Sequence, residues 1–351
     1  MGDASLASCR AERLQRTRGG VTILTSMQWF YGPTWGRTLR VCGHGTQTAC
    51  AQWDEVHARQ MELVEVLRRN LAHPAVQEVH VLVGEVEPVR HFLRRLPWYH
   101  RKGCLLNLIG TGTRPKFKDY LAHIGTALLG RPVVMTNQDV FLGDGWWDKL
   151  PASLPPKTAF LLSRYHQRVT YDTQHSWAAG LAEGLFNRSA AFPARRKERP
   201  SLGVTIPSSA RASRRTCDMA APRMAVWSRS LCHSRNFGSY DAYVLRLDAP
   251  LSAEELALFD YPQNAWGGEN VFQYLLQEAL LLKTRNPCLG LKALHMHCEL
   301  PTTFSGPKVG DRRMGKLEIA LAAQRKLRAM GRTVTMDARD IGSLALNVTY
   351  T

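Results

Sequence analysis

The feature that most constrains the fold is a regular alternation of short apolar runs with amphipathic segments across residues 21–165. The apolar runs are rich in β-branched residues, which favour buried strands, and the longer segments repeat their apolar residues with the period of a helix. The order predicts an α/β fold with a mostly parallel sheet flanked by helices. We expect strands at residues 21–27, 76–84, 104–109, 133–135 and 158–165, and helices at residues 52–71, 89–96 and 117–129.

The predicted strand at residues 133–135 is followed by a polar stretch, Asn137-Gln138-Asp139. In open α/β sheets, ligands bind outside the carboxyl ends of the strands, so this stretch is placed to meet one. Asn137 and Asp139 carry oxygen atoms of the kind that bind Mn²⁺ or Mg²⁺ together with a diphosphate. The alternative is an ordinary turn after a strand, for which Asn and Asp are typical.

The basic composition raises a different class of function, because the formal net charge of the 351 residues is +17. Such a charge is compatible with nucleic acid, anionic membranes or phosphate-bearing ligands as partners. The excess is concentrated at residues 168–235 and after Pro301, and no nucleic-acid-binding signature accompanies it. We therefore expect no nucleic acid partner. A strongly salt-dependent affinity for DNA or RNA would contradict this expectation.

Cysteine spacing and targeting signals indicate the cellular compartment in which the protein works. The eight cysteines show neither a CxxC pair nor zinc-like spacing, so we predict no disulfide framework and no structural zinc, although their number permits a disulfide in a secretory lumen. No apolar run reaches the roughly 18 residues of a transmembrane helix, and the first residues lack a signal-peptide core. As written, the chain is expected to be cytoplasmic.

Composition divides the chain into three parts. Residues 1–20 are polar and Arg-rich, and we expect a disordered leader. Residues 21–300 form the predicted α/β domain, which a Ser-, Arg- and Pro-rich insertion interrupts at about 167–236. The centre of this insertion is expected to be disordered, and its charge is either a solvated surface or a binding site. Residues 301–351 form a tail with one helix at residues 316–330.

Two acids lie at the beginnings of elements predicted after the insertion. Asp241 lies near the start of a strand at residues 239–247. Glu269, with Asn270 beside it, opens a helix, where negative charge is favoured by the helix dipole. Glu269 is therefore either a helix-capping acid or a base held at a cleft.

Three further residues are candidates for a metal or phosphate site. The last core strand is predicted at residues 286–297, and its two-residue period places His295 and His297 on one face. There they either support the fold or bind one ion or phosphate. Arg164, at the end of the strand at residues 158–165, is either an exposed loop residue or a phosphate contact.

These motifs, in this order, resemble the GT-A fold nucleotide-diphospho-sugar transferases, and especially a poorly characterised glycosyltransferase-like group. The resemblance covers residues 21–298 outside the insertion, and it rests on the order of the motifs rather than on any one of them. The motifs are VTILTSM, RQMELVEVLRRNLAHPAVQEVHVL, KFKDYLAHIG, TNQDVFLGDG, LLSRY, GSYDAYVL, DYPQNAWGGEN and NPCLGLKALHMHC.

The resemblance implies a Rossmann-like GT-A domain with a metal-assisted donor site. In such enzymes an acidic DxD-type motif binds Mn²⁺ or Mg²⁺, and through the metal it binds the donor diphosphate. Asp139 inherits that role, whereas Asn137 departs from the motif and removes one carboxylate. His297 or His295 is implied to complete the metal or diphosphate site.

The same resemblance implies the reaction. Glu269 matches the family's catalytic base, with Asn270 beside it in the donor site, Asp241 lining the cleft and Arg164 near the phosphates. The expected activity is transfer of a sugar from a nucleotide-diphospho-sugar to a hydroxyl of a carbohydrate, glycoprotein or glycolipid. The resemblance also implies the Golgi lumen as an alternative to the cytoplasm, if an N-terminal anchor precedes this chain. Glu269 as base describes inversion, although the sequence does not choose between inversion and retention. The alternative is a non-catalytic nucleotide- or carbohydrate-binding domain of the same fold, suggested by the missing first acid.

Overall fold

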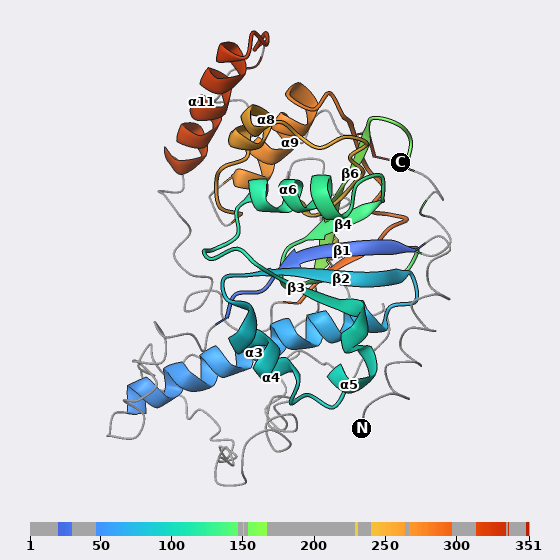
Figure 1. Cartoon of the computed structure of the whole chain (residues 1–351), viewed down its shortest axis with the longest axis vertical. Helices are drawn as coiled ribbons and strands as arrows, with labels where there is room; N and C mark the ends of the chain where they lie inside the picture. The colour runs from blue at the N-terminus through green and yellow to red at the C-terminus, as the bar shows by residue number, and fades with distance from the viewer. Residues whose placement is uncertain are drawn as a thin grey trace, which may run out of the picture.

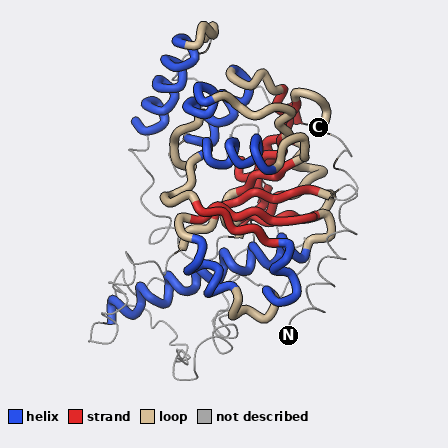
Figure 2. The backbone as a smooth tube through the Cα atoms, in the orientation of Figure 1, coloured by secondary structure: helices blue, strands red, loops and turns tan. Residues whose placement is uncertain are grey.

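The computed structural model describes residues 20–29, 47–146, 150, 154–166, 229–230, 240–263, 267–296, 314–334, 336 and 349–350. Over these residues the chain is a mixed α/β fold in which a central sheet lies between two layers of helices (Figure 1, Figure 2). The predicted α/β class, with a mostly parallel sheet flanked by helices, is therefore confirmed.

The elements follow the predicted alternation, with some ends shifted. The described strands are β1 (Val21–Ser26), β2 (Val76–Val83), β3 (Leu106–Gly110), β4 (Val133–Thr136), β5 (Val140–Leu142), β6 (Thr158–His166), β7 (Arg229–Ser230), β8 (Tyr240–Leu245), β9 (Lys283–Asn286), β10 (Ala293–His295) and β11 (Thr349–Tyr350). The described helices are α3 (Gln47–Ala72), α4 (Val86–Leu93), α5 (Tyr99–Lys102), α6 (Phe117–Ala127), α8 (Ala253–Leu258), α9 (Gly268–Glu278) and α11 (Met314–Ala329), with a 3-10 turn, η2 (Gly103–Leu105).

The main path of the sheet has the order β11-β9-β6-β8-β4-β1-β2-β3. β1 pairs in parallel with both β2 and β4, and β3 extends this parallel set beyond β2. β8 is antiparallel to β4 on one side and to β6 on the other. A smaller group, in which β10 pairs with β5 and β6, lies off this path.

Both faces of the parallel strands are buried. In β2, Val79, Val81 and Val83 belong to a core cluster with residues of α3 and α4. Leu82 points to the opposite face and joins a second cluster, which includes residues of α6, α8, α9 and α11. Strands buried on both faces carry nearly continuous apolar runs instead of an alternating pattern. This explains why short apolar runs were enough to locate them.

The predicted strand at residues 286–297 is wrong, because the structure divides it in two. β9 ends at Asn286, and the chain turns before β10 begins at Ala293. Pro287 has no backbone N–H and cannot continue the ladder, and its carbonyl accepts the N–H groups of Gly290 and Leu291 at 2.9 and 2.8 Å. The break moves His295 from the sheet's main path into the β5–β10–β6 group.

The tail and the insertion each contribute to the described fold. The predicted tail helix is confirmed as α11, which packs against α8 and α9. Near the end of the tail, β11 pairs in parallel with β9. Within the predicted insertion the structure describes only β7, which pairs with β6. Residues 1–19 of the predicted leader lie outside the described residues.

Two cysteines realise the possibility, left open by the sequence, that the chain contains a disulfide. Cys104 and Cys288 are both disulfide-bonded. Cys288 is fully buried in the first core cluster, and Cys104 packs against that cluster. Spacing along the sequence reveals bonds only within local motifs, so it does not predict bonds made across a fold.

Candidate functional site

The strand order identifies one edge of the sheet as the place for a ligand. From β1 the chain runs outward through β2 and β3, and β4 then pairs on the opposite side of β1. In open α/β sheets, ligands bind outside the carboxyl ends of the strands where the order reverses. Gln28, after β1, and Gln138, after β4, flank this point, and the N–H of Gln28 donates to Oε1 of Gln138 at 2.8 Å.

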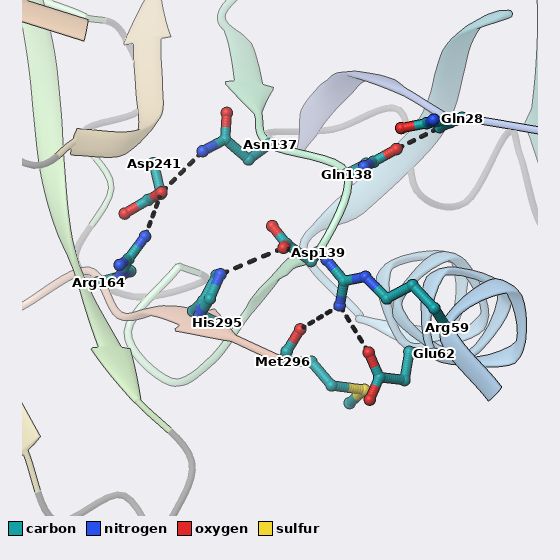
Figure 3. Close-up of polar contacts among 10 residues, drawn as sticks. All are labelled: Gln28, Arg59, Glu62, Asn137, Gln138, Asp139, Arg164, Asp241, His295 and Met296. Carbon is teal, nitrogen blue, oxygen red and sulfur yellow. Dashed lines mark hydrogen bonds and ion pairs between the residues drawn. The ribbon is translucent and has the colours of Figure 1, made fainter. Parts of the chain in front are cut away.

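Beside this point, Asn137, Asp241 and Arg164 form a chain of hydrogen bonds, which we call the arginine relay (Figure 3). Nδ2 of Asn137 donates to Oδ1 of Asp241 at 2.7 Å, and Nη1 of Arg164 donates to the same oxygen at 2.8 Å. Asp241 is fully buried, whereas the side chain of Arg164 keeps 24% of its accessible surface. The relay therefore joins a buried carboxylate to a guanidinium that solvent reaches.

An irregularity in β8 sets the position of Asp241. Leu162 of β6 lies opposite Ala242, but the next residue, Ser163, lies opposite Tyr240. Asp241 is thus the extra residue of a β-bulge. Bulges often occur next to functional sites, where they redirect a side chain that regular pairing would hold elsewhere.

Asp139 belongs to a second group, the Asp139 cluster, formed with Arg59, Glu62 and His295 (Figure 3). Oδ2 of Asp139 lies 2.6 Å from Nη2 of Arg59 and 3.2 Å from Nε2 of His295. Nη1 of Arg59 also contacts Glu62 at 2.6 Å. Burial lowers the pKa of Arg59, but the charges of Glu62 and Asp139 raise it by more, so Arg59 is a permanent cation.

Glu269 lies within electrostatic range of the relay. It is half-buried near the start of α9, directly after Gly267 and Gly268, and Gly267 adopts a left-handed φ of 68° that only glycine takes readily. Burial lowers the pKa of Arg164, but the charges of Asp241, Glu269 and Asp139 raise it by more, so the pKa lies above its ordinary value. The negative charge of the predicted base thus contributes to the raised pKa of the predicted phosphate contact.

Asn270 is buried in the first turn of α9, where its backbone N–H donates to the carbonyl of Gly267 at 3.1 Å. This bond helps to fix the start of the helix beside Glu269. Among the described residues, Asn270 therefore supports the start of α9 next to the site.

The residues expected to hold a divalent cation do not converge on one point. Asn137 turns toward Asp241, while Asp139 turns toward Arg59 and His295 (Figure 3). The described residues include no group of three or more His, Cys, Asp or Glu side chains arranged to hold a metal. His297 lies outside the described residues. The geometry of Asn137 and Asp139 therefore does not fit a cation bound between them.

Sequence reasoning did not assign Arg59 and Glu62 to the site. They were placed only within the predicted helix at residues 52–71, although the structure buries both, with exposed fractions of 5% and 1%. The available signal was two charged residues on a helix face shared with core residues such as Val66. Charged residues are rarely buried unless they are paired, so such a position indicates an unseen partner.

Comparisons with known proteins do not assign a family. No protein-family model matches the chain, and no curated protein matches it either. Among the described helices, none is long and apolar enough to cross a membrane. The function is therefore argued from the site itself.

Proposed function

We propose that this protein is a GT-A-type transferase that moves a sugar from a nucleotide-diphospho-sugar donor to an acceptor hydroxyl. The observation that carries the proposal is the arginine relay at the reversal point of the sheet, with Glu269 in electrostatic contact with it. This arrangement supports a phosphate-binding role for Arg164 and a base role for Glu269 at the sheet edge where α/β folds bind ligands.

Glu269 and Arg164 have different roles in the proposed reaction. Glu269 takes the proton of the acceptor hydroxyl, whose oxygen attacks the anomeric carbon of the donor. The bond between that carbon and the phosphate oxygen breaks, and the nucleoside diphosphate leaves with the bonding electrons. Arg164 stabilises the negative charge that develops on this leaving group, because a guanidinium binds phosphate through two parallel N–H donors.

The acceptor and the compartment follow from the same proposal. We infer a hydroxyl of a carbohydrate, glycoprotein or glycolipid as the acceptor. The disulfides of Cys104 and Cys288 support an oxidising compartment such as the Golgi lumen over the cytoplasm, where thiols are kept reduced. Mass mapping of peptides from the non-reduced, secreted protein checks this part of the proposal, and free thiols at both positions would contradict it.

A non-catalytic nucleotide- or carbohydrate-binding domain is the second candidate. It is favoured by the engagement of Asp139 with Arg59 and His295, which occupies the carboxylate expected to bind the metal. Transfer of a sugar separates the two candidates, since a binding domain takes up ligand without turning it over.

The test begins with thermal-shift scans of the whole chain with UDP, GDP and their sugars. A ligand that binds only the native state raises the midpoint, and a concentration of about 100 times Kd adds about 2.7 kcal/mol of stability. The donor so identified is then assayed for transfer. We expect Glu269→Gln to keep donor binding while lowering turnover by at least about 100-fold. Unchanged turnover in this variant would exclude Glu269 as the base.

A further inference from the structure

We propose that the donor diphosphate is held by Arg164, fixed in place by Asn137 and Asp241, and that Asn137 and Asp139 do not form a divalent-cation site. This inference rests on the proposed function, which it deepens by naming how the site binds phosphate. It also accounts for the asparagine at position 137, where the DxD-type motif has an acid: the asparagine is a part of the relay and not a weakened metal ligand.

The first step is the direction of the hydrogen bond between Asn137 and Asp241. Nδ2 of Asn137 donates to Oδ1 of Asp241 at 2.7 Å, and the backbone N–H of Asn137 donates to the carbonyl of Asp241 at 2.9 Å. An aspartate at position 137 has no N–H on its side chain. Its carboxylate would face that of Asp241 at hydrogen-bond distance, where two negative charges repel. The relay therefore requires an amide at this position.

The second step is the charge state of Asp139. Its Oδ2 lies 2.6 Å from a buried arginine that stays protonated, and 3.2 Å from Nε2 of His295. Turning this carboxylate toward a metal would break one of the two buried ion pairs of Arg59, the other being with Glu62, and breaking a buried ion pair is costly in general. Asp139 is thus already neutralised from within the protein.

The third step is the position of Arg164. Its side chain is the charged part of the relay that solvent reaches, with 24% of its surface exposed against 1% for Asp241. A buried acceptor at 2.8 Å fixes the guanidinium before any ligand arrives. Such preorganisation lowers the entropy lost on binding, and the planar fork of arginine matches phosphate oxygens. Asn137 and Asp241 therefore act as positioning residues for Arg164.

The first experiment uses Mn²⁺ alone and then UDP and GDP, each in EDTA or with Mn²⁺, and it follows thermal midpoints and calorimetric affinities of the whole chain. We expect no midpoint shift with Mn²⁺ alone, and the same nucleotide affinity in EDTA as in Mn²⁺. A Mn²⁺-dependent affinity that Asp139→Asn abolishes would overturn the inference.

The second experiment creates the carboxylate that the inference says must be absent. Asn137→Asp should lower the midpoint in EDTA by at least about 4 °C through repulsion of Asp241, and Mn²⁺ should restore part of this loss by binding between the two carboxylates. Asn137→Ala is the matched control, because it removes the same amide without adding charge and should not respond to Mn²⁺. An Asn137→Asp protein with an unchanged midpoint in EDTA would contradict the relay.

The third experiment separates the positioned arginine from a bare positive charge. Arg164→Lys keeps the charge but loses the fork, and we expect nucleotide affinity to fall about 10- to 100-fold. Asp241→Asn keeps an acceptor oxygen for Arg164 and should retain more affinity than Asp241→Ala; equal losses in the two would contradict positioning. If no nucleotide binds the wild type, the proposed donor chemistry fails, while the responses to Mn²⁺ alone still decide whether position 137 belongs to a cation site.

Discussion

The sheet carries two polar clusters, one at each end of its parallel strands. They differ in how many of their buried polar atoms have hydrogen-bond partners. The cluster at the amino ends lies beneath α6, and its members bond one another. Glu78 accepts from Arg131 at 2.6 Å, and His80 bonds His123 at 2.8 Å. We call it the amino-end cluster, and its members are Glu78, His80, Asn107, His123 and Arg131.

At the carboxyl ends, hydrogen bonding within the described residues is incomplete. Among the described residues, Oδ2 of Asp241 and Oγ1 of Thr136 are buried and have no hydrogen-bond partner. A buried polar atom left in this state costs about 1–3 kcal/mol, so most proteins keep few of them. The contrast indicates that the amino-end cluster serves stability, whereas the carboxyl-end residues are arranged for a ligand.

The strongest test of the contrast concerns Arg59, which pairs with the buried carboxylates of Asp139 and Glu62. Replacing Arg59 by Met removes the cation that neutralises two buried carboxylates, and we expect a loss of about 3–5 kcal/mol in the free energy of unfolding. Urea unfolding measures it as a lower midpoint at unchanged slope. The control is Arg68→Met, because Arg68 pairs with Glu65 while 43% of its side chain is exposed, and its loss should stay below about 1 kcal/mol. Equal losses would show that Arg59 does not neutralise Asp139.

Acid should weaken the amino-end cluster through Glu78. The hydrogen bond from His80 lowers the pKa of Glu78, burial opposes it, and Arg131 lowers it further, to about 2 from the ordinary 4.5. The stabilisation is therefore complete above pH 4.5 and is lost as the pH falls toward 2. We expect about 2 kcal/mol, since solvent screens the partly exposed Arg131. Glu78→Gln should flatten this part of the curve of unfolding free energy against pH.

His123 should act at milder pH. Burial and the neighbouring His80 lower its pKa to about 4 from 6.5, against the opposing charge of Glu78. The fold thus favours the neutral ring, and stability that is complete above pH 6.5 declines as the pH falls toward 4. We expect a loss of about 1–2 kcal/mol for this half-buried ring. Urea titrations between pH 7 and about pH 5 measure it, and a His123→Gln protein that keeps the same slope would assign the decline to another group.

The smallest effect is expected at the relay. Asp241→Asn keeps an oxygen for Asn137 and Arg164, and Oδ2 has no described partner to lose, so we expect less than about 1 kcal/mol. Glu78→Gln, compared at pH 7, should cost more. A larger loss of unfolding free energy from Asp241→Asn than from Glu78→Gln would contradict the assignment of the amino-end cluster to stability and of the carboxyl-end residues to ligand binding.

The place of the site could be predicted from the sequence, because it depends on local patterns. An apolar strand followed by Asn137, Gln138 and Asp139 marks a strand end, and α/β folds bind ligands at such ends. The helix that Glu269 opens was equally visible, since its apolar period begins there. These features need only neighbouring residues.

The partners of those residues could not be predicted in the same way. Asp241 lies 104 residues after Asn137, and Arg59 lies 80 residues before Asp139. Which distant residues meet depends on strand order and on a bulge that no periodicity reveals. The asparagine at position 137 was therefore interpreted as a missing metal ligand, whereas its contacts make it a hydrogen-bond donor to a carboxylate. The break at Pro287, by contrast, was a local signal that the alternation of His295 and His297 obscured.

The bulge in β8 has a consequence for how the strand tolerates change. Leu162 lies opposite Ala242 and Ser163 lies opposite Tyr240, so Ala242 and Tyr240 face opposite sides of the sheet although Asp241 separates them. Deleting Asp241 would therefore keep both residues in their core clusters and would remove only the carboxylate of the relay. The bulge thus adds a side chain to the site without changing which residues β8 contributes to the core.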